Sequence, residues 1–327
     1  LLFSFSNFSK NLLSNLDIWN EIEDLSYSFD SIKFKDNLVY EQFLLRNQVS
    51  EKYLNSLGWT AKYSDIRSLL INKLNNLNNI HFISNNHLKD ESINFDFEFN
   101  FKKYDEFSLS TSKSLAEQSI IFNVYLRSNV EKRLYEINTT EGLICLTPIN
   151  KNIYQIIWNN ASTQIKDRAL CSKSFFLDNL TILLPDELKI DQIIGDINFL
   201  NVCKLSSSFL IKNKSIYFNE NKFKSNILYN FEFDIFLKNA IEVFNLLENN
   251  EPKNNKIPNK FVFYYFYRKF IELKIKFSFS FIIIKLFILN NVFILMLRKL
   301  FFIILKRINL LKILIIKNIF NSKNFLN

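Results

Sequence analysis

The chain has 327 residues, enough for one large domain or two interleaved ones, and its hydrophobic content of 48% excludes an intrinsically disordered protein. Its net charge of +9 comes from one end, because residues 256–327 contain 14 lysines and arginines against one glutamate, a net charge of +13. A basic, apolar tail of this kind indicates an element that lies on a membrane surface. No RNA-binding or DNA-binding motif accompanies the charge, so we expect no nucleic-acid partner.

The cysteines and histidines predict no metal site. Cys145, Cys171 and Cys203 are far apart and form no CxxC pair, which also excludes a dithiol redox motif. A sparse, odd number of cysteines is typical of a reducing compartment. His81 and His87 lie in an asparagine-rich stretch with no cysteine or third histidine near them. We therefore expect no bound metal ion.

The first part of the chain predicts an alternation of helices and strands. Residues 8–24 and 64–76 carry apolar side chains at helical spacing, and Ser64 is the predicted N-cap of the second helix. Short alternating or apolar segments predict three strands, at 31–36, 38–43 and 79–84. This order of elements predicts an α/β layer.

The middle of the chain predicts an antiparallel β region. Four apolar segments follow one another with turns between them, at 118–126, 133–138, 142–149 and 153–159. Further along, residues 186–202 and 234–249 predict helices, and residues 215–218 predict a strand.

The tail begins after a polar segment at 251–260, which predicts a linker. An apolar run of 21 residues at 277–297 is long enough to cross a bilayer, but Lys285 lies near its middle. A central lysine costs about 2.5–3.5 kcal/mol on insertion. We therefore expect the helices of 261–327 to be buried or to lie on a surface, with a membrane span as the alternative.

The segment from Tyr135 to Pro148 resembles a motif of the ubiquinone-biosynthesis flavin hydroxylases, AYERFTPxGPLALLPL. These enzymes are FAD-dependent aromatic monooxygenases of the p-hydroxybenzoate hydroxylase fold. Six residues agree without gaps: Tyr135, Glu136, Thr139, Gly142, Leu146 and Pro148. Three more segments resemble the family in the family's order: 8–36, 57–74 and 297–315. The alternative is that Gly142 and Pro148 mark only a turn and a bulge in a sheet.

The resemblance implies a mixed fold, α+β or α/β, in two interleaved parts followed by C-terminal helices. An incomplete FAD-binding, Rossmann-like domain would comprise residues 1–29, 59–112 and 209–250. An antiparallel β-sheet substrate domain would comprise residues 30–58 and 113–208. In this family the cofactor is FAD, and the substrate is a polyprenylated phenol.

The resemblance also implies the positions of the binding sites. The family's cofactor motifs fall on Arg67, Asp96, Glu220, Asn230, Glu232 and Asp234. Thr139, Gly142 and Pro148 would lie on the substrate side. No side chain is implied as catalytic, because the flavin carries the chemistry.

The sequence departs from the family at the glycines that FAD binding requires. Asn230 and Glu232 replace glycines that admit the flavin ring and the phosphates, Ile227 replaces a proline, and Phe97 replaces a glycine of a third motif. The family's N-terminal GxGxxG turn would precede the first residue. We therefore expect a degenerate, N-terminally truncated homologue with impaired FAD binding.

Three functions stay open. The first is a flavoprotein oxidoreductase in ubiquinone biosynthesis, held as a peripheral protein on the bacterial cytoplasmic face or on the matrix side of the mitochondrial inner membrane. The second is a non-catalytic homologue that binds other ubiquinone-synthesis proteins as a scaffold. The third is an unrelated, membrane-anchored structural protein.

Overall fold

The computed structural model describes residues 2–46, 56–79, 98–100, 117–127, 131–159, 167, 172–202, 209–212, 215–218, 234, 237, 240–241, 244–245 and 290–320. The predicted linker at 251–260 lies outside these residues, as do almost all of the strand predicted at 79–84 and most of the apolar run at 277–297.

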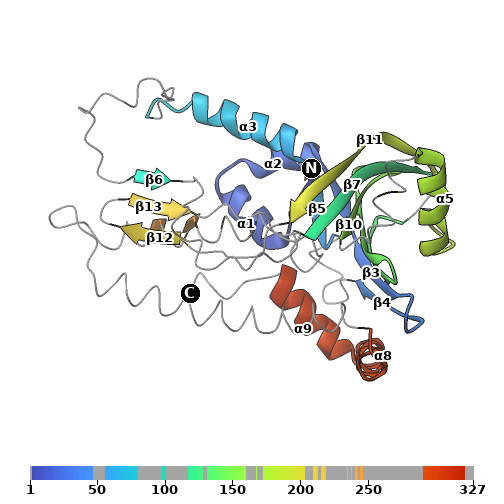
Figure 1. Ribbon diagram of the computed structural model, residues 1–327. Helices are drawn as coiled ribbons and strands as arrows, with labels where there is room; N and C mark the ends of the chain where they lie inside the picture. Colours follow the sequence, from blue (N-terminus) through green and yellow to red (C-terminus); the bar gives the residue numbers. More distant parts are fainter. Residues whose placement is uncertain are drawn as a thin grey trace.

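A seven-stranded sheet forms the largest layer of the protein (Figure 1), with the strand order β11-β7-β10-β9-β8-β3-β4. The strands are β3 (Ser31–Asp36), β4 (Glu41–Arg46), β7 (Glu117–Leu126), β8 (Arg133–Thr139), β9 (Gly142–Pro148), β10 (Ile153–Asn159) and β11 (Ile190–Val202). Neighbouring strands are antiparallel except β3 and β8, which run parallel. The predicted antiparallel β region is therefore confirmed.

The two faces of this sheet pack against different helices, because successive side chains of a strand point to opposite sides. On one face, helix α5 (Lys173–Leu183) packs Phe176 and Leu180 against a large apolar core that includes Phe122 and Trp158. The ring centroids of Phe122 and Phe176 are 5.2 Å apart. On the other face, the helices α8 (Val292–Arg307) and α9 (Asn309–Phe320) cover the region of β3 and β4.

A second, three-stranded sheet is antiparallel, with the order β1 (Leu2–Phe5), β5 (Gly58–Lys62), β2 (Ser26–Phe29). Three helices share its apolar core: α1 (Asn7–Asn15), α2 (Trp19–Asp24) and α3 (Tyr63–Asn75). The core includes Trp19 and Trp59, whose ring centroids are 5.0 Å apart. The hydroxyl of Thr60 on β5 donates to the carbonyl oxygen of Pro148 at 2.5 Å, so this sheet touches the end of β9.

A third, small sheet has the order β12 (Phe209–Lys212), β13 (Ser215–Phe218), β6 (Glu98–Asn100), which confirms the strand predicted at 215–218. The described positions between 234 and 245 are helical, as predicted, and Leu237 packs against the core beneath β1 and β5. The division of the chain into two domains stays a prediction.

Two predicted helix boundaries are wrong. The helix predicted at 8–24 is two helices, because Asp17 takes a positive φ of 55° between them. Ser64 is not the N-cap of α3; Lys62 holds that position, and the Ser64 hydroxyl donates to Asp65. The strand predicted at 38–43 is also displaced, since β4 begins at Glu41.

The helix predicted at 186–202 is wrong, because most of this segment is the edge strand β11. Its pairing with β7 is irregular between Ile194 and Asn198, and Gly195 within this irregularity has a φ of 73°. A bulge shifts the side-chain alternation of a strand. Here Ile193 and Ile197 both pack against the core, four residues apart, which is the spacing of a helix.

A buried ion pair joins the C-terminal helices to the large sheet. The Nη1 atom of Arg298 on α8 lies 3.1 Å from Oδ2 of Asp36, and both side chains are 0% exposed. The same carboxylate accepts hydrogen bonds from Nδ2 of Asn138 at 3.0 Å and from the backbone N–H of Leu38 at 2.8 Å. Burial lowers the pKa of Arg298, and the charge of Asp36 opposes this shift.

We expect the Arg298→Met variant to lose about 3–5 kcal/mol of unfolding free energy, because Asp36 would remain as a buried charge without its cation. Urea unfolding followed by circular dichroism measures this loss. The control is Lys306→Met, which breaks a surface pair with Glu41. Lys306→Met should lower the free energy of unfolding by at most about 1 kcal/mol. Equal losses in the two variants would contradict a special role for the buried pair.

Candidate functional site

The corner where β1 turns into α1 holds a buried polar cluster. Ser6 is the N-cap of α1, and its hydroxyl oxygen accepts a hydrogen bond from the N–H of Phe8 at 3.1 Å. The carboxylate of Asp234 accepts a hydrogen bond from the backbone N–H of Ser6 at 3.3 Å and another from the hydroxyl of Ser9. The structure thus places Asp234, a predicted FAD-motif residue, directly against the start of α1.

The carboxyl group of Asp234 is unusual because it is buried. Burial raises its pKa from 3.8 to about 6, although the hydrogen bonds from Ser6 and Ser9 act in the opposite direction. It makes no ion pair with any residue that the structure describes. Near neutral pH this group therefore exists in both protonation states, and it can either donate or accept a hydrogen bond.

Asn7 lies in the same corner and has unused hydrogen-bonding capacity. It is the first residue of α1 and only 3% exposed, yet neither Nδ2 nor Oδ1 finds a partner within the described structure. A buried polar group without a partner costs about 1–3 kcal/mol. A ligand that offers both an acceptor and a donor at this corner would remove that cost.

A second polar strip crosses the face of the large sheet opposite α5. Thr147, Gln155 and Asn123 lie side by side on β9, β10 and β7. Gln155 donates to Asn123 at 3.5 Å, whereas the hydroxyl of Thr147, a residue 3% exposed, has no partner among the described residues. Nearer the other end of these strands, Ser119 donates to Asn159 at 2.6 Å. Within this strip the hydroxyl of Thr147 is thus the polar group that the described structure leaves unused.

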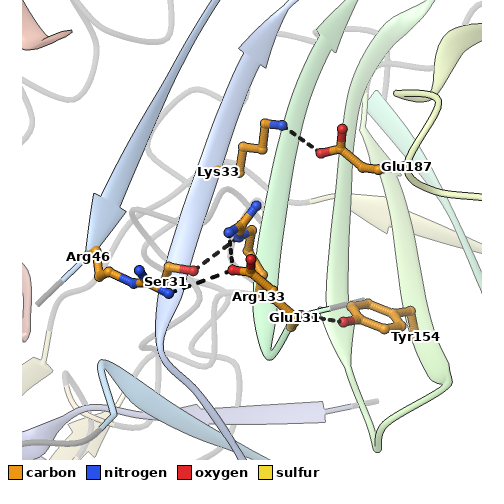
Figure 2. Close-up of polar contacts among 7 residues, drawn as sticks. All are labelled: Ser31, Lys33, Arg46, Glu131, Arg133, Tyr154 and Glu187. Carbon is orange, nitrogen blue, oxygen red and sulfur yellow. Dashed lines mark hydrogen bonds and ion pairs between the residues drawn. The ribbon is translucent and has the colours of Figure 1, made fainter. Parts of the chain in front are cut away.

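A third group of polar residues lies at the start of β3 and β8 (Figure 2). Glu131 pairs with Arg133 and lies 3.7 Å from Arg46, and Arg133 also donates to Ser31 at 3.1 Å. The hydroxyl of Tyr154 donates to the carbonyl oxygen of Glu131 at 3.4 Å. These contacts tie the segment before β8 to neighbouring strands.

The network in Figure 2 is better explained as structural than as a ligand site. The side chain of Glu131 is 63% exposed, and Lys33 pairs with Glu187 at 2.6 Å across the same surface. Burial raises the pKa of Tyr154, and it raises that of Tyr135 to about 12, so neither phenol ionises at neutral pH. Each charge already has a partner, which leaves little for a ligand to satisfy.

The predicted substrate-side residues lie at the two ends of β9. Thr139 and Gly142 close the β8–β9 turn, where the Thr139 hydroxyl donates to the carbonyl oxygen of Gly142 at 2.7 Å. Gly142 has a φ of 120°, which favours glycine. Pro148 lies at the opposite end, in contact with Thr60. A turn role for Gly142 is thus observed, and the substrate-side role stays a prediction.

The predicted cofactor residues other than Asp234 are not brought together by the described structure. Arg67 is exposed on α3 and forms no ion pair with another described residue. The remaining positions lie outside the described residues: Asp96, Phe97, Glu220, Ile227, Asn230 and Glu232. Sequence reasoning missed Ser6, Asn7 and Ser9; for Ser6 the signal was a serine two residues before the predicted helix at 8–24.

Comparison with known proteins identifies the fold. No protein-family model matches the sequence, and no curated protein matches it. The structure resembles p-nitrophenol 4-monooxygenase PnpA from Pseudomonas putida, with a TM-score of 0.69 and 10% identity over 98% of this chain and 89% of that one. It also resembles PqsL from Pseudomonas aeruginosa, described as a probable FAD-dependent monooxygenase, with a TM-score of 0.57 and 8% identity over 77% and 78% of the two chains.

The chain has the fold of FAD-dependent aromatic monooxygenases. A flavoprotein/dehydrogenase from Cytophaga hutchinsonii agrees, with a TM-score of 0.52 and 10% identity over 72% of this chain and 66% of that one. The predicted mixed fold class is therefore confirmed, with a large, mainly antiparallel sheet beside smaller sheets and helices. At these identities the likeness concerns the fold, and FAD is the cofactor that this resemblance implies.

The β1–α1 corner offers such a cofactor the buried polar groups of Asn7 and Asp234. A flavin ring carries carbonyl oxygens and an N–H group, and the Asn7 amide offers a donor and an acceptor that no described residue uses. Asn7 and Asp234 are therefore the described residues that would hold a flavin.

Replacing Asp234 by asparagine should change how stability depends on pH. Because its folded-state pKa of about 6 lies above the ordinary 3.8, the folded chain holds this proton more tightly than the unfolded chain. Proton binding by Asp234 therefore adds about 3 kcal/mol to the free energy of unfolding below about pH 4, and this contribution is lost as the pH rises to about 6. Asp234→Asn should remove this dependence of the unfolding free energy on pH, and it should stabilise the chain at neutral pH.

Urea unfolding at a series of pH values measures this effect. The control is Asp24→Asn on the exposed side of α2, which should keep the slope because Asp234 is still present. An unchanged slope in Asp234→Asn would show that this carboxyl is not the group responsible.

Proposed function

We propose that this chain is a degenerate homologue of the FAD-dependent aromatic monooxygenases and that it binds FAD weakly. The observation that most supports this is the similarity to p-nitrophenol 4-monooxygenase over 98% of the chain. When bound, FAD would supply the oxygen-transfer chemistry. The part of the protein would be to bind and orient the flavin, through Asn7 and Asp234, and to exclude water.

Weak binding follows from the residues at the family's glycine positions. Glycines allow a backbone to approach a phosphate or a ring closely, and Asn230 and Glu232 stand in two of these positions. A glutamate there would also place a negative charge beside a pyrophosphate, which is unfavourable. We expect FAD to bind with lower affinity than in a glycine-containing homologue.

We infer that the substrate is a polyprenylated phenol in ubiquinone biosynthesis. The resemblance of residues 135–148 to the motif of that family supports this substrate. The buried hydroxyl of Thr147, which no described residue engages, is able to bind a phenolic oxygen on the sheet face opposite α5.

The second candidate function is a non-catalytic scaffold in the ubiquinone-synthesis assembly. The side chains at positions 230 and 232 favour it, since a chain that cannot admit the flavin cannot hydroxylate. The two functions differ in one property, the binding of FAD.

Titration of FAD with the purified chain, followed by the quenching of flavin fluorescence, tests the proposal. The wild type should bind FAD measurably, and Asn7→Leu should weaken binding about tenfold or more, since a lost buried hydrogen bond costs about 1–3 kcal/mol. Asn230→Gly combined with Glu232→Gly should strengthen binding.

Asn15→Leu is the matched control, because it makes the same change at an exposed position of the same helix. It should leave the affinity unchanged. Thermal unfolding of Asn7→Leu without FAD checks the fold, and the variant should be at least as stable as the wild type. Absence of FAD binding in the wild type and in the double glycine variant would refute the flavin proposal and favour the scaffold.

A further inference from the structure

Helices α8 and α9 lie beneath β3 and β4 in Figure 1, and they expose apolar side chains. One side of α8 is buried against the sheet through Arg298, Phe302 and Leu305. Phe293 and Met296 on α8 are 69% and 64% exposed. The exposed apolar side chains of the pair form what we call the α8–α9 surface: Val292, Phe293, Met296, Leu297, Leu300, Ile304, Ile308, Leu310 and Leu314.

The spacing along α8 places its exposed apolar residues in one stripe. Phe293, Met296, Leu300 and Ile304 are separated by three or four residues, so they follow one side of the helix. A contiguous exposed apolar patch on a folded domain marks an interaction surface more often than a chance arrangement. The α8–α9 surface therefore marks an interaction site for a partner with apolar chemistry.

The charges around the α8–α9 surface indicate the charge that its partner carries. Residues 290–320 contain no aspartate or glutamate, whereas Lys299, Lys306 and Arg307 are exposed on the same helix as the stripe. Lys306 pairs with Glu41 at 2.6 Å, but Lys299 and Arg307 form no ion pair with a described residue. An apolar surface bordered by cations without acids matches an anionic lipid surface.

We propose that the α8–α9 surface docks onto an anionic phospholipid bilayer, with both helices lying at the interface. A second copy of this chain is the weaker occupant, because two acid-free surfaces would bring like charges together. Among the described residues, no helix has the length and apolar character needed to cross a membrane. This inference is independent of FAD binding, since none of these residues lies in the β1–α1 corner.

Co-sedimentation of the full chain with vesicles tests the proposal. Binding to phosphatidylcholine vesicles that contain phosphatidylglycerol should exceed binding to phosphatidylcholine alone, and it should weaken as salt is added. Removing Lys299 or Arg307 by substitution with alanine should weaken binding about fivefold each, since a basic residue near the surface contributes about 1 kcal/mol. Phe293→Ser with Met296→Ser should weaken it more.

Ile182→Ser is the matched control, because Ile182 is an equally apolar, exposed residue on α5. It should leave vesicle binding unchanged, and the melting temperatures of all variants should stay close to the wild type because the altered side chains are exposed. Vesicle binding that is unaffected by the α8 substitutions would overturn the proposal. So would a wild-type dimer that these substitutions convert to a monomer without any change in vesicle binding.

Insertion is tested directly by a fluorescent probe in the stripe. The native tryptophans Trp19, Trp59 and Trp158 are at most 5% exposed, so they give a constant background. In the Phe293→Trp variant, vesicles with brominated acyl chains should quench the added fluorescence. Equal quenching of the variant and the wild type would contradict contact between α8 and the bilayer.

Discussion

The ion pair between Arg298 and Asp36 determines how the C-terminal part of the chain is placed. Two fully buried charges are tolerated only when each has close partners, and Asp36 satisfies this through Arg298, Asn138 and Leu38. The pair connects residues 262 positions apart, so it orients α8 on the sheet. Arg298 lies on the buried side of α8, and Phe293, Met296 and Leu300 of the same helix are exposed. This charge pair therefore helps to fix which side of α8 is buried and which side is exposed.

The sequence predicted the sheet well where strand alternation is regular. β9 and β10 each keep one apolar and one mixed side, so their patterns are clear. Prediction failed where the backbone departs from regularity. The bulge at Gly195 gave β11 a helical spacing, and the positive φ of Asp17 broke a helix whose apolar pattern continues across the break. Such local conformations depend on tertiary pairing more than on composition.

The candidate site was predictable only in part, for a related reason. Asp234 was found through a motif resemblance, but its raised pKa and its contact with Ser9 depend on two segments 225 residues apart in sequence. Asn7 carries no sequence signal, because an asparagine after a serine at a helix start is ordinary. Its significance comes from burial without a partner, which appears only once the chain is folded.

A crystal structure of the chain with saturating FAD tests the central claim most directly. The proposal predicts one flavin at the β1–α1 corner, with its polar atoms within hydrogen-bond distance of Nδ2 or Oδ1 of Asn7 and with the Asp234–Ser9 contact adjacent. Flavin density elsewhere on the chain would contradict it. So would a corner in which the Asn7 amide is satisfied by protein atoms and no flavin is present.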